Sequence, residues 1–198
     1  GGCVCARGRG RGGADGMKLA LVVPGGVDRS GTHRVIPALL ALVERLARVH
    51  EVHVFALHQE ATAGTWPLAG ATIHNIGERW TRLRAIHAMR REPRRAPFDA
   101  IQAIFSGNCG LVAVAAARWL GVHSLVHVAG GELVALADID YGGRRRLSSR
   151  VRESLVLRGA GVVTAASAPI LGSLRDLGIA ARRVPLGVDL DAWPVRPP

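Results

Sequence analysis

The sequence predicts an open, mostly parallel, Rossmann-like α/β sheet with helices on both faces. Short apolar runs of strand length alternate along the chain with segments whose apolar residues recur at helical spacing. The strand-like runs are nearly continuously apolar, as expected for parallel strands that are covered on both sides. Because the strand–loop–helix order repeats five or six times, we expect parallel pairing through helical crossovers.

The elements can be placed in order along the chain. The first strand is expected at 18–24, KLALVVP, and it runs into a glycine pair. The first helix follows a loop, and Pro37 suits its first turn. Gly121 and Gly178 are expected to end later helices. The other strands are expected at 51–57, 71–77, 98–105, 123–129 and 160–166, and the other helices at 79–92, 110–121, 143–158 and 168–177.

Length and composition indicate one folded domain with irregular ends. The chain has 198 residues, of which 48% are hydrophobic and 21% charged, so it can bury a core. Residues 1–16 are rich in glycine and arginine and are predicted to be a flexible tail; 17–187 are predicted to form the domain, and 188–198 a hinge or linker. No apolar run approaches the roughly 18–20 residues of a membrane span, and no secretory signal is visible. We therefore expect a cytoplasmic protein.

The formal net charge is +11, and the positive charge is nearly all arginine, with Lys18 the only lysine. The arginines are scattered along the chain, so we attribute them to codon bias and solvated faces and expect no specific nucleic-acid partner. A positive field favours anionic partners, including nucleotide phosphates and acidic lipids. Peripheral contact with the inner membrane surface is therefore compatible with the sequence.

The sequence carries no motif for metal, serine or P-loop chemistry. It lacks paired-cysteine spacing, H-E-x-x-H and G-x-S-x-G, and the glycine loop at 24–34 is not G-x-G-x-x-G. Cys3, Cys5 and Cys109 are interpreted as unpaired thiols in a reducing compartment. His53 and His127 fall within strands, where a histidine is more often structural. We therefore expect no metal and no cofactor, and no residue is identified as catalytic.

Ligands of open α/β sheets bind beyond the carboxyl ends of the strands, and the loop at 24–34 occupies that edge. Gly25 and Gly26 would let the backbone approach a ligand, and the following helix N-terminus offers free N–H groups to an anion. His33 and Arg34 either add positive charge there or point to solvent. The sequence leaves two interpretations of this loop: a phosphate- or sugar-binding site, or a plain strand-to-helix turn.

Two further loops lie at the same predicted edge. In the loop at 105–110, Ser106 and Asn108 either bond sugar hydroxyls or cap the next helix. In the other loop, Gly130 and Gly131 permit a sharp turn that brings Glu132 to the crevice, where a carboxylate can accept hydrogen bonds or act as a base. The acids that follow, Asp138 and Asp140, are interpreted as loop residues.

Four segments in order resemble the family 4 glycosyltransferases, which are retaining enzymes of the GT-B fold. They are the opening MKLALVVPGG with its long helix and HEVHVF strand, then FDAIQAIFSGNCGLVAVAAARWLGV, HVAGGEL, and VVTAASAPILGSLRDLGIAARRVPLGVDLDAWP. The resemblance covers 17–198 and ends in the G-V-D segment that precedes the hinge of that family. It implies that the chain is the N-terminal, acceptor-binding half of a GT-B enzyme.

The resemblance also implies roles for individual residues. The complete enzyme would move a sugar from a nucleotide-sugar to a glycan, lipid or small-molecule acceptor, with retained configuration and without a bound metal. Gly25 and Gly26 would contact the donor diphosphate. The sugar and acceptor side of the cleft would be shaped by Gly130, Gly131, Glu132, Ser106, His33 and Arg34.

The chain departs from the family in two ways. Ala129 stands where the family has a histidine, and His127 lies two residues earlier, so the role of that histidine does not transfer. The chain also stops soon after the hinge motif, so we expect a truncated protein that lacks the donor-binding domain and is inactive alone. The alternatives are a non-catalytic glycan- or nucleotide-binding module of the same fold, and a charge-driven binder of nucleic acid or membrane.

Overall fold

The structure, a computed structural model, describes residues 16–92, 96–133 and 147–187. The predicted tail, the predicted linker and the acids Asp138 and Asp140 lie outside these ranges, apart from Gly16 at the end of the tail. The strands are β1 (Lys18–Val23), β2 (Glu51–Ala56), β3 (Gly64–Leu68), β4 (Ala71–Asn75), β5 (Ala100–Ile104), β6 (His123–Val128), β7 (Val162–Ala165) and β8 (Arg182–Arg183). The helices are α1 (Pro37–Ala47), α2 (Thr81–Arg91), α3 (Asn108–Leu120), the 3-10 helix η1 (Gly131–Leu133), α4 (Leu147–Gly159) and α5 (Ala168–Asp176).

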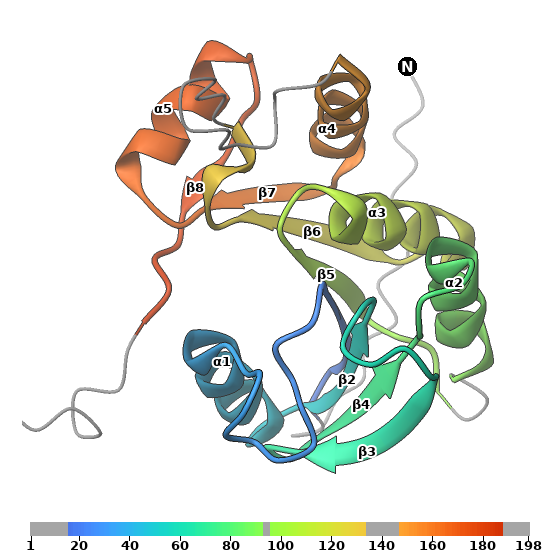
Figure 1. Cartoon of the computed structure of the whole chain (residues 1–198). Helices are drawn as coiled ribbons and strands as arrows, with labels where there is room; N and C mark the ends of the chain where they lie inside the picture. Colours follow the sequence, from blue (N-terminus) through green and yellow to red (C-terminus); the bar gives the residue numbers. More distant parts are fainter. Residues whose placement is uncertain (1–15, 93–95, 134–146, 188–198) are drawn as a thin grey trace, which may run out of the picture.

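The strands form one sheet in the order β3-β4-β2-β1-β5-β6-β7-β8, with only the β3–β4 pair antiparallel (Figure 1). From β1 the chain first builds outward through β2 to β4, and then crosses to β5 and builds in the other direction. The strand order therefore reverses between β1 and β5. In a parallel sheet, the carboxyl ends of such neighbouring strands open the crevice in which ligands bind.

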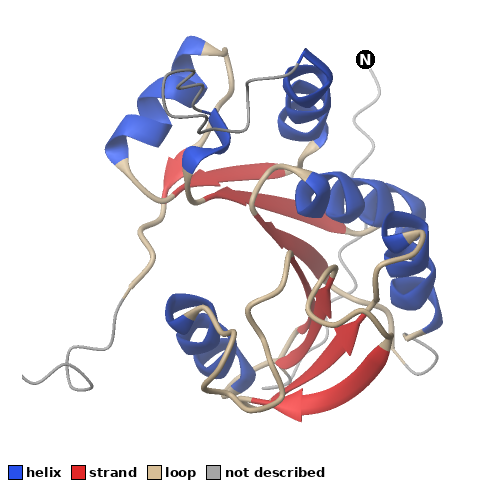
Figure 2. Ribbon diagram, in the orientation of Figure 1, coloured by secondary structure: helices blue, strands red, loops and turns tan. Residues whose placement is uncertain are grey.

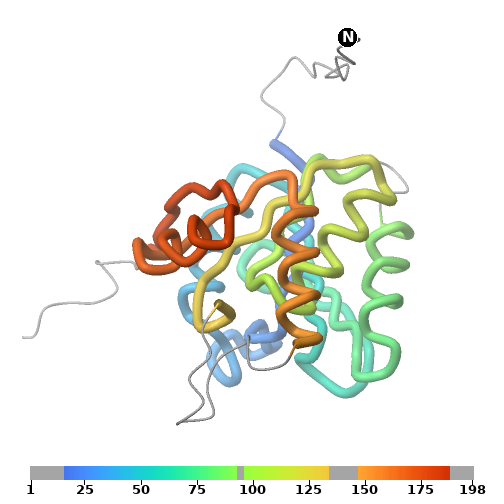
Figure 3. Tube along the Cα trace, turned by 90° about the horizontal axis from the view of Figure 1, so that it is seen from above, coloured from blue at the N-terminus to red at the C-terminus, as the bar shows by residue number. Residues whose placement is uncertain are grey.

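Side chains of β1 alternate between two buried clusters, one on each face of the sheet. Leu19, Leu21 and Val23 belong to the cluster that α1 covers, whereas Ala20 and Val22 belong to the cluster that α2, α3, α4 and α5 cover. Figure 2 shows α1 by itself on its face, and Figure 3 shows the helices of the other face from above. The predicted Rossmann-like sheet with helices on both faces is thus confirmed, with the helices unevenly divided.

All six predicted strands and all five predicted α-helices are present. Pro37 occupies the first turn of α1, and Gly121 caps α3 in a left-handed conformation, as expected. Two strands were not predicted. The edge strand β3, GTWPL, contains glycine and proline and buries only Trp66 fully, so it lacks the apolar pattern of the central strands, and β8 has only two residues. Within the described ranges, no helix is both long and apolar enough to span a membrane.

Candidate functional site

The candidate site lies at the carboxyl edge of the sheet, around the point where the strand order reverses. The loop at 24–36 follows β1, the turn at 105–107 follows β5, and the turn at 129–133 follows β6. A fourth segment, 57–63, follows β2, the other neighbour of β1. The three loops predicted from the sequence therefore do leave adjacent strands at one edge.

A buried glutamine holds the glycine loop in place. Gln59 is only 3% exposed, and its Oε1 accepts hydrogen bonds from the backbone N–H of Gly26 at 2.7 Å and of Val27 at 3.0 Å. Its Nε2 lies 3.4 Å from Oδ2 of Asp28 and 3.5 Å from the carbonyl oxygen of Arg34. The amide of Gly26 is therefore engaged within the protein, and the contact of Gly25 and Gly26 with a diphosphate stays a prediction.

Backbone geometry explains why glycine stands at position 26. Gly26 has φ +84°, a left-handed conformation, and a Cβ there would lie 2.6 Å from Cγ1 of Ile36. The carbonyl oxygen of Gly26 also accepts a hydrogen bond from the Ile36 amide at 3.0 Å, just before α1 begins. This close approach closes the loop.

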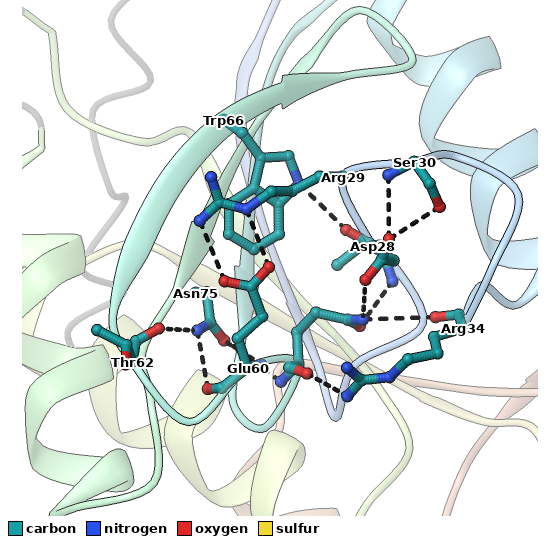
Figure 4. A network of polar contacts seen from close by, with 10 residues as sticks. Asp28, Arg29, Ser30, Arg34, Glu60, Thr62, Trp66 and Asn75 are labelled. Carbon is teal, nitrogen blue, oxygen red and sulfur yellow. Dashed lines mark hydrogen bonds and ion pairs between the residues drawn. The ribbon is translucent and has the colours of Figure 1, made fainter.

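The outer part of the loop is organised around Asp28 (Figure 4). Its Oδ1 accepts hydrogen bonds from the backbone N–H and the hydroxyl of Ser30, at 3.0 and 2.8 Å, and these bonds lower the pKa of Asp28. His33 is exposed, whereas the guanidinium of Arg34 donates to the carbonyl oxygen of Gln59. Of the two predicted cationic side chains, Arg34 is thus tied to the neighbouring loop.

A second set of contacts joins the same loop to the edge of the sheet. Arg29 forms a two-point ion pair with Glu60, at 2.9 and 3.0 Å, and its guanidinium lies 4.5 Å from the ring centroid of Trp66 (Figure 4). Asn75 at the end of β4 donates to the carbonyl oxygens of Glu60 and Thr62. Sequence reasoning missed Gln59 and Asn75, although polar residues at the carboxyl ends of apolar strands were the available signal.

The turns after β5 and β6 are joined by Glu132. One carboxylate oxygen accepts from the Ser106 amide at 3.1 Å and the other from the Gly130 amide at 2.7 Å. Phe105, between β5 and Ser106, has φ +80°, a conformation that L-residues rarely adopt and that concentrates at functional sites. The structure therefore brings together Ser106, Gly130 and Glu132, which the sequence had placed at one cleft.

The Ser106 hydroxyl is fully buried and has no hydrogen-bond partner among the described residues. The reading of Ser106 or Asn108 as a helix cap is wrong. Gly107 occupies the N-cap position of α3 without a side-chain hydrogen bond, and Asn108 is already the first residue of the helix. The sharp turn after β5 directs the Ser106 amide toward Glu132 instead. A carboxylate that accepts one N–H at each oxygen keeps lone pairs for substrate hydroxyls.

Two residues near the turns are structural. Burial, reinforced by the negative charge of Glu132, raises the pKa of Cys109 to about 12, so this thiol is held protonated. His127 is 3% exposed, its Nδ1 lies 2.8 Å from the hydroxyl of Thr164 on β7, and burial lowers its pKa. The sequence reading of His127 as a structural residue fits this contact.

An apolar cavity of about 630 Å³ opens beside the site, where β2 ends and α2 and α3 begin. Its lining includes Leu57, His58, Trp80, Leu83 and Leu111. Trp80 is 75% exposed and stands at the N-cap of α2 with φ +53°. A large exposed aromatic side chain at a concave apolar surface is typical of a binding site. No sequence pattern indicated this cavity.

Comparisons with known proteins agree with the architecture. Residues 31–187 match the sequence profile of the family described as "Glycosyl transferase 4-like domain". No curated protein sequence matched the chain.

Similar solved structures include sucrose-phosphate synthase from Thermosynechococcus elongatus, with a TM-score of 0.66, 12% identity, and coverage of 88% of this chain and 49% of that one. Anabaena Alr3699/HepE, solved in complex with UDP, has a TM-score of 0.60 at 12% identity, over 91% and 47% of the two chains. UDP-N-acetylglucosamine 2-epimerase from Rickettsia bellii has a TM-score of 0.55 at 10% identity, over 84% and 44%.

The chain thus spans about half the length of each of these structures, and at such identities the likeness concerns the fold, one Rossmann-like half of the GT-B architecture. The profile match covers most of the described residues, including the loop after β1 from Gly31 onward and the turns after β5 and β6. The chain belongs to the glycosyl transferase 4-like family.

Proposed function

We propose that this chain is the acceptor-side half of a glycosyltransferase that moves a sugar from a nucleotide-sugar to an acceptor. The observation that carries the proposal is the joining of the Ser106 and Glu132 turns beside the glycine loop, at the reversal of strand order between β1 and β5. The family match and the UDP bound to the structurally similar HepE support a nucleotide-sugar as the donor.

Each part of the edge has a role in this proposal. The spare lone pairs of the half-buried Glu132 bond hydroxyl groups of the sugar or the acceptor, and the amide of the buried Ser106 holds that carboxylate in place. Gly25, which has no side chain, allows the diphosphate close to the loop, and the exposed His33 offers an imidazole N–H to it. Catalysis would rest on positioning and charge stabilisation by two halves, with retained configuration and without a metal in the transfer step. The 198-residue chain alone is then expected to show no turnover.

The apolar cavity beside the site suits the acceptor. It opens at the same edge as the glycine loop, and Trp80 and Leu83 at its mouth would pack against an apolar or ring-shaped group. An acceptor with such a group, either a lipid-linked or an aromatic aglycone, would stand with its hydroxyl toward Glu132.

Titration of the chain with UDP, UDP-sugars and candidate acceptors, followed by NMR, tests the proposal. Ligand-induced changes in NMR chemical shift are expected in the loops at 24–36, 105–107 and 129–133. Glu132→Gln removes the charge and one acceptor oxygen of this turn, so the variant should bind the sugar at least about 3-fold more weakly. Glu44→Gln on α1 is the matched control, since this exposed acid pairs with Arg48 one helix turn further along the chain. Shifts confined to other surfaces, or equal binding by both variants, would contradict the proposal.

A second candidate is a non-catalytic glycan-binding module of the same fold. The occupation of the Gly26 and Val27 amides by Gln59 favours it, because those groups are not free to bind a diphosphate. The same titration separates the candidates. A glycosyltransferase half responds to UDP-sugars or acceptors and regains turnover when a donor-binding domain is supplied, whereas a module binds free glycan and never turns over. Rapid transfer by the purified chain alone would refute the two-half proposal.

A further inference from the structure

Two histidines and a glutamate come together on the face of the sheet that α2 covers, away from the loops of the carboxyl edge. His53 lies on β2, His74 on β4, and Glu92 is the C-cap residue of α2. One ligand atom from each lies within 4.8 Å of the other two, and this is the one such group of metal-ligand type found in the described part of the chain. No sequence motif marks this group, because the three residues come from separate elements.

The distances suit a single ion. Nδ1 of His53 lies 3.0 Å from Nε2 of His74 and 3.5 Å from Oε1 of Glu92, and Nε2 of His74 lies 4.0 Å from Oε2 of Glu92. Ligands at about 2.0–2.2 Å from a tetrahedral zinc ion are separated by about 3.3–3.6 Å. The two Glu92 distances end at different oxygens, and one oxygen lies within 4.8 Å of both imidazole nitrogens. A rotation of the Glu92 carboxylate, with small movements of the two rings, would therefore bring one oxygen and both nitrogens into such a coordination sphere.

A fourth residue sets the direction of the first imidazole. The carboxylate of Glu51 lies 2.8 Å from Nε2 of His53 and is itself paired with Lys18 at 2.8 Å. Because a carboxylate can only accept, Nε2 of His53 carries the proton and Nδ1 presents its lone pair to the cluster. A carboxylate that bonds the far nitrogen of a histidine is the usual outer support of a metal-bound imidazole.

The surroundings hold the cluster yet leave one side open. The His53 and His74 rings stack at a centroid distance of 5.3 Å, and Phe55 stacks on His74 at 4.7 Å. His53 is 5% exposed, whereas His74 and Glu92 line a cavity of about 870 Å³ together with Arg84, His87 and Arg91. An ion can enter through this cavity, which also has room for a water or an anionic fourth ligand.

We propose that His53, His74 and Glu92 bind a divalent transition metal of the zinc class, through two imidazole nitrogens and one carboxylate oxygen. Two nitrogens and one oxygen suit zinc, cobalt, nickel or copper rather than magnesium or calcium. On binding, the neutral His74 ring moves its proton from Nε2 to Nδ1, so its lone pair replaces the hydrogen bond to His53. The ion would fasten the end of α2 to β2 and β4. This site does not depend on the proposed function.

Zinc titration by calorimetry and Co²⁺ absorption spectra, in a Cys3→Ser/Cys5→Ser background of the whole chain, provide the test. One zinc per chain is expected, with a cobalt spectrum that lacks thiolate charge transfer, no competition by magnesium, and a higher thermal midpoint with zinc. Glu92→Gln and His74→Gln should weaken zinc binding by at least about 10-fold, and Glu51→Gln by about 10-fold through the His53 ring.

Two variants serve as matched controls. Glu44→Gln changes an exposed acid on α1, and His87→Gln changes a histidine that lines the same cavity but stacks edge-on against Trp119. Both should keep wild-type affinity within about 2-fold, well short of the effect of a lost ligand. Glu92 is partly exposed, so Glu92→Gln should fold normally and its result can be interpreted. The absence of stoichiometric zinc in the background protein, or equal affinity of Glu92→Gln and Glu44→Gln, would overturn the site.

Discussion

The loop after β1 and the turn after β6 are held by the same device, with opposite consequences. In each region, one side chain accepts hydrogen bonds from two backbone N–H groups. Gln59 accepts from Gly26 and Val27 through a single oxygen, and Glu132 accepts from Ser106 and Gly130 through its two oxygens. Gln59 is neutral, buried and comes from another loop, so it fixes a shape and uses up the amides. Glu132 is charged, half-buried and on its own turn, so it keeps free lone pairs next to an unpartnered hydroxyl. The first region supplies shape, and the second supplies polar chemistry.

Removing the shaping residue is expected to have the largest effect. Gln59→Ala leaves the amides of Gly26 and Val27 without their acceptor, and two such losses should reduce the free energy of unfolding by about 3–4 kcal/mol. Urea unfolding followed by circular dichroism measures this. Gln102→Ala, a half-buried glutamine of β5, is the control, with an expected loss of about 1 kcal/mol or less. Equal losses would mean that Gln59 does not organise the loop.

A change of the glycine that Gln59 holds should have the next largest effect. Gly26→Ala puts a Cβ into a left-handed position, 2.6 Å from Ile36, and should destabilise the protein by about 2–3 kcal/mol. Gly172→Ala, inside α5 with open space around its Cβ, should instead stabilise by about 0.5–1 kcal/mol. Thermal unfolding of both variants separates backbone strain from the general effect of adding a methyl group. A neutral result for Gly26→Ala would contradict the loop geometry.

The charged region should respond less in stability. Glu132→Gln keeps one acceptor oxygen but sets an amide NH₂ against a backbone N–H, for a loss of about 1–2 kcal/mol. If the two regions differ as described, Glu132→Gln weakens sugar binding more than it weakens the fold, and Gln59→Ala does the reverse. Unfolding experiments and ligand titrations on both variants measure this. If the loss of sugar binding and the loss of unfolding free energy stand in the same ratio in both variants, the two regions do not differ in role.

Cys109 reports the charge of Glu132 through its pKa. In the folded protein this pKa is raised to about 12 from an ordinary value of 9.0, so native Cys109 should resist alkylation at pH 8 while the unfolded chain reacts. Mass spectrometry of the labelled peptide distinguishes it from Cys3 and Cys5. Glu132→Gln should lower the pKa and speed the labelling.

The same raised pKa has a consequence for stability. The thiol adds stability below pH 9, and this part is lost as the pH rises from about 9 to about 12, because only the unfolded chain then releases the proton. Cys109→Ala should flatten that part of the pH–stability curve. An unchanged slope would contradict the pKa shift.

The smallest effect is expected at the outer rim of the β1 loop. Glu60→Gln breaks the two-point pair with Arg29, which is exposed and already packed on Trp66. Exposed ion pairs contribute little and are screened by salt. The loss in unfolding free energy should be below that of Glu132→Gln and should shrink further in high salt, as urea unfolding at two salt concentrations would show. If Glu60→Gln lowered the unfolding free energy as much as Gln59→Ala does, the Arg29–Glu60 pair and not Gln59 would be the contact that holds the loop.

Most strands and helices could be predicted because the apolar pattern of their sequence matches the residues that the fold buries. The continuous apolar run of β1 is buried throughout, and Pro37 and Gly121 mark helix ends by their own backbone restrictions. The edge strand β3 was missed because an edge strand needs no apolar period and relies on pairing with β4. The placement of the glycine loop and the Glu132 turn at one edge followed from parallel topology, which the strand–helix alternation implies.

The sequence by itself determined the fold class, the family and which loops form the candidate site, since these depend on periodicity and on the order of segments. Only the tertiary structure decided what the polar groups of those loops do. Gln59 meets Gly26 across 33 residues, and Glu132 meets Ser106 across 26. His53, His74 and Glu92 likewise meet only where two strands and a helix end pack together. Long-range contacts of this kind depend on how the chain crosses between strands. The local sequence pattern around an acceptor side chain does not indicate which distant N–H group will donate to it.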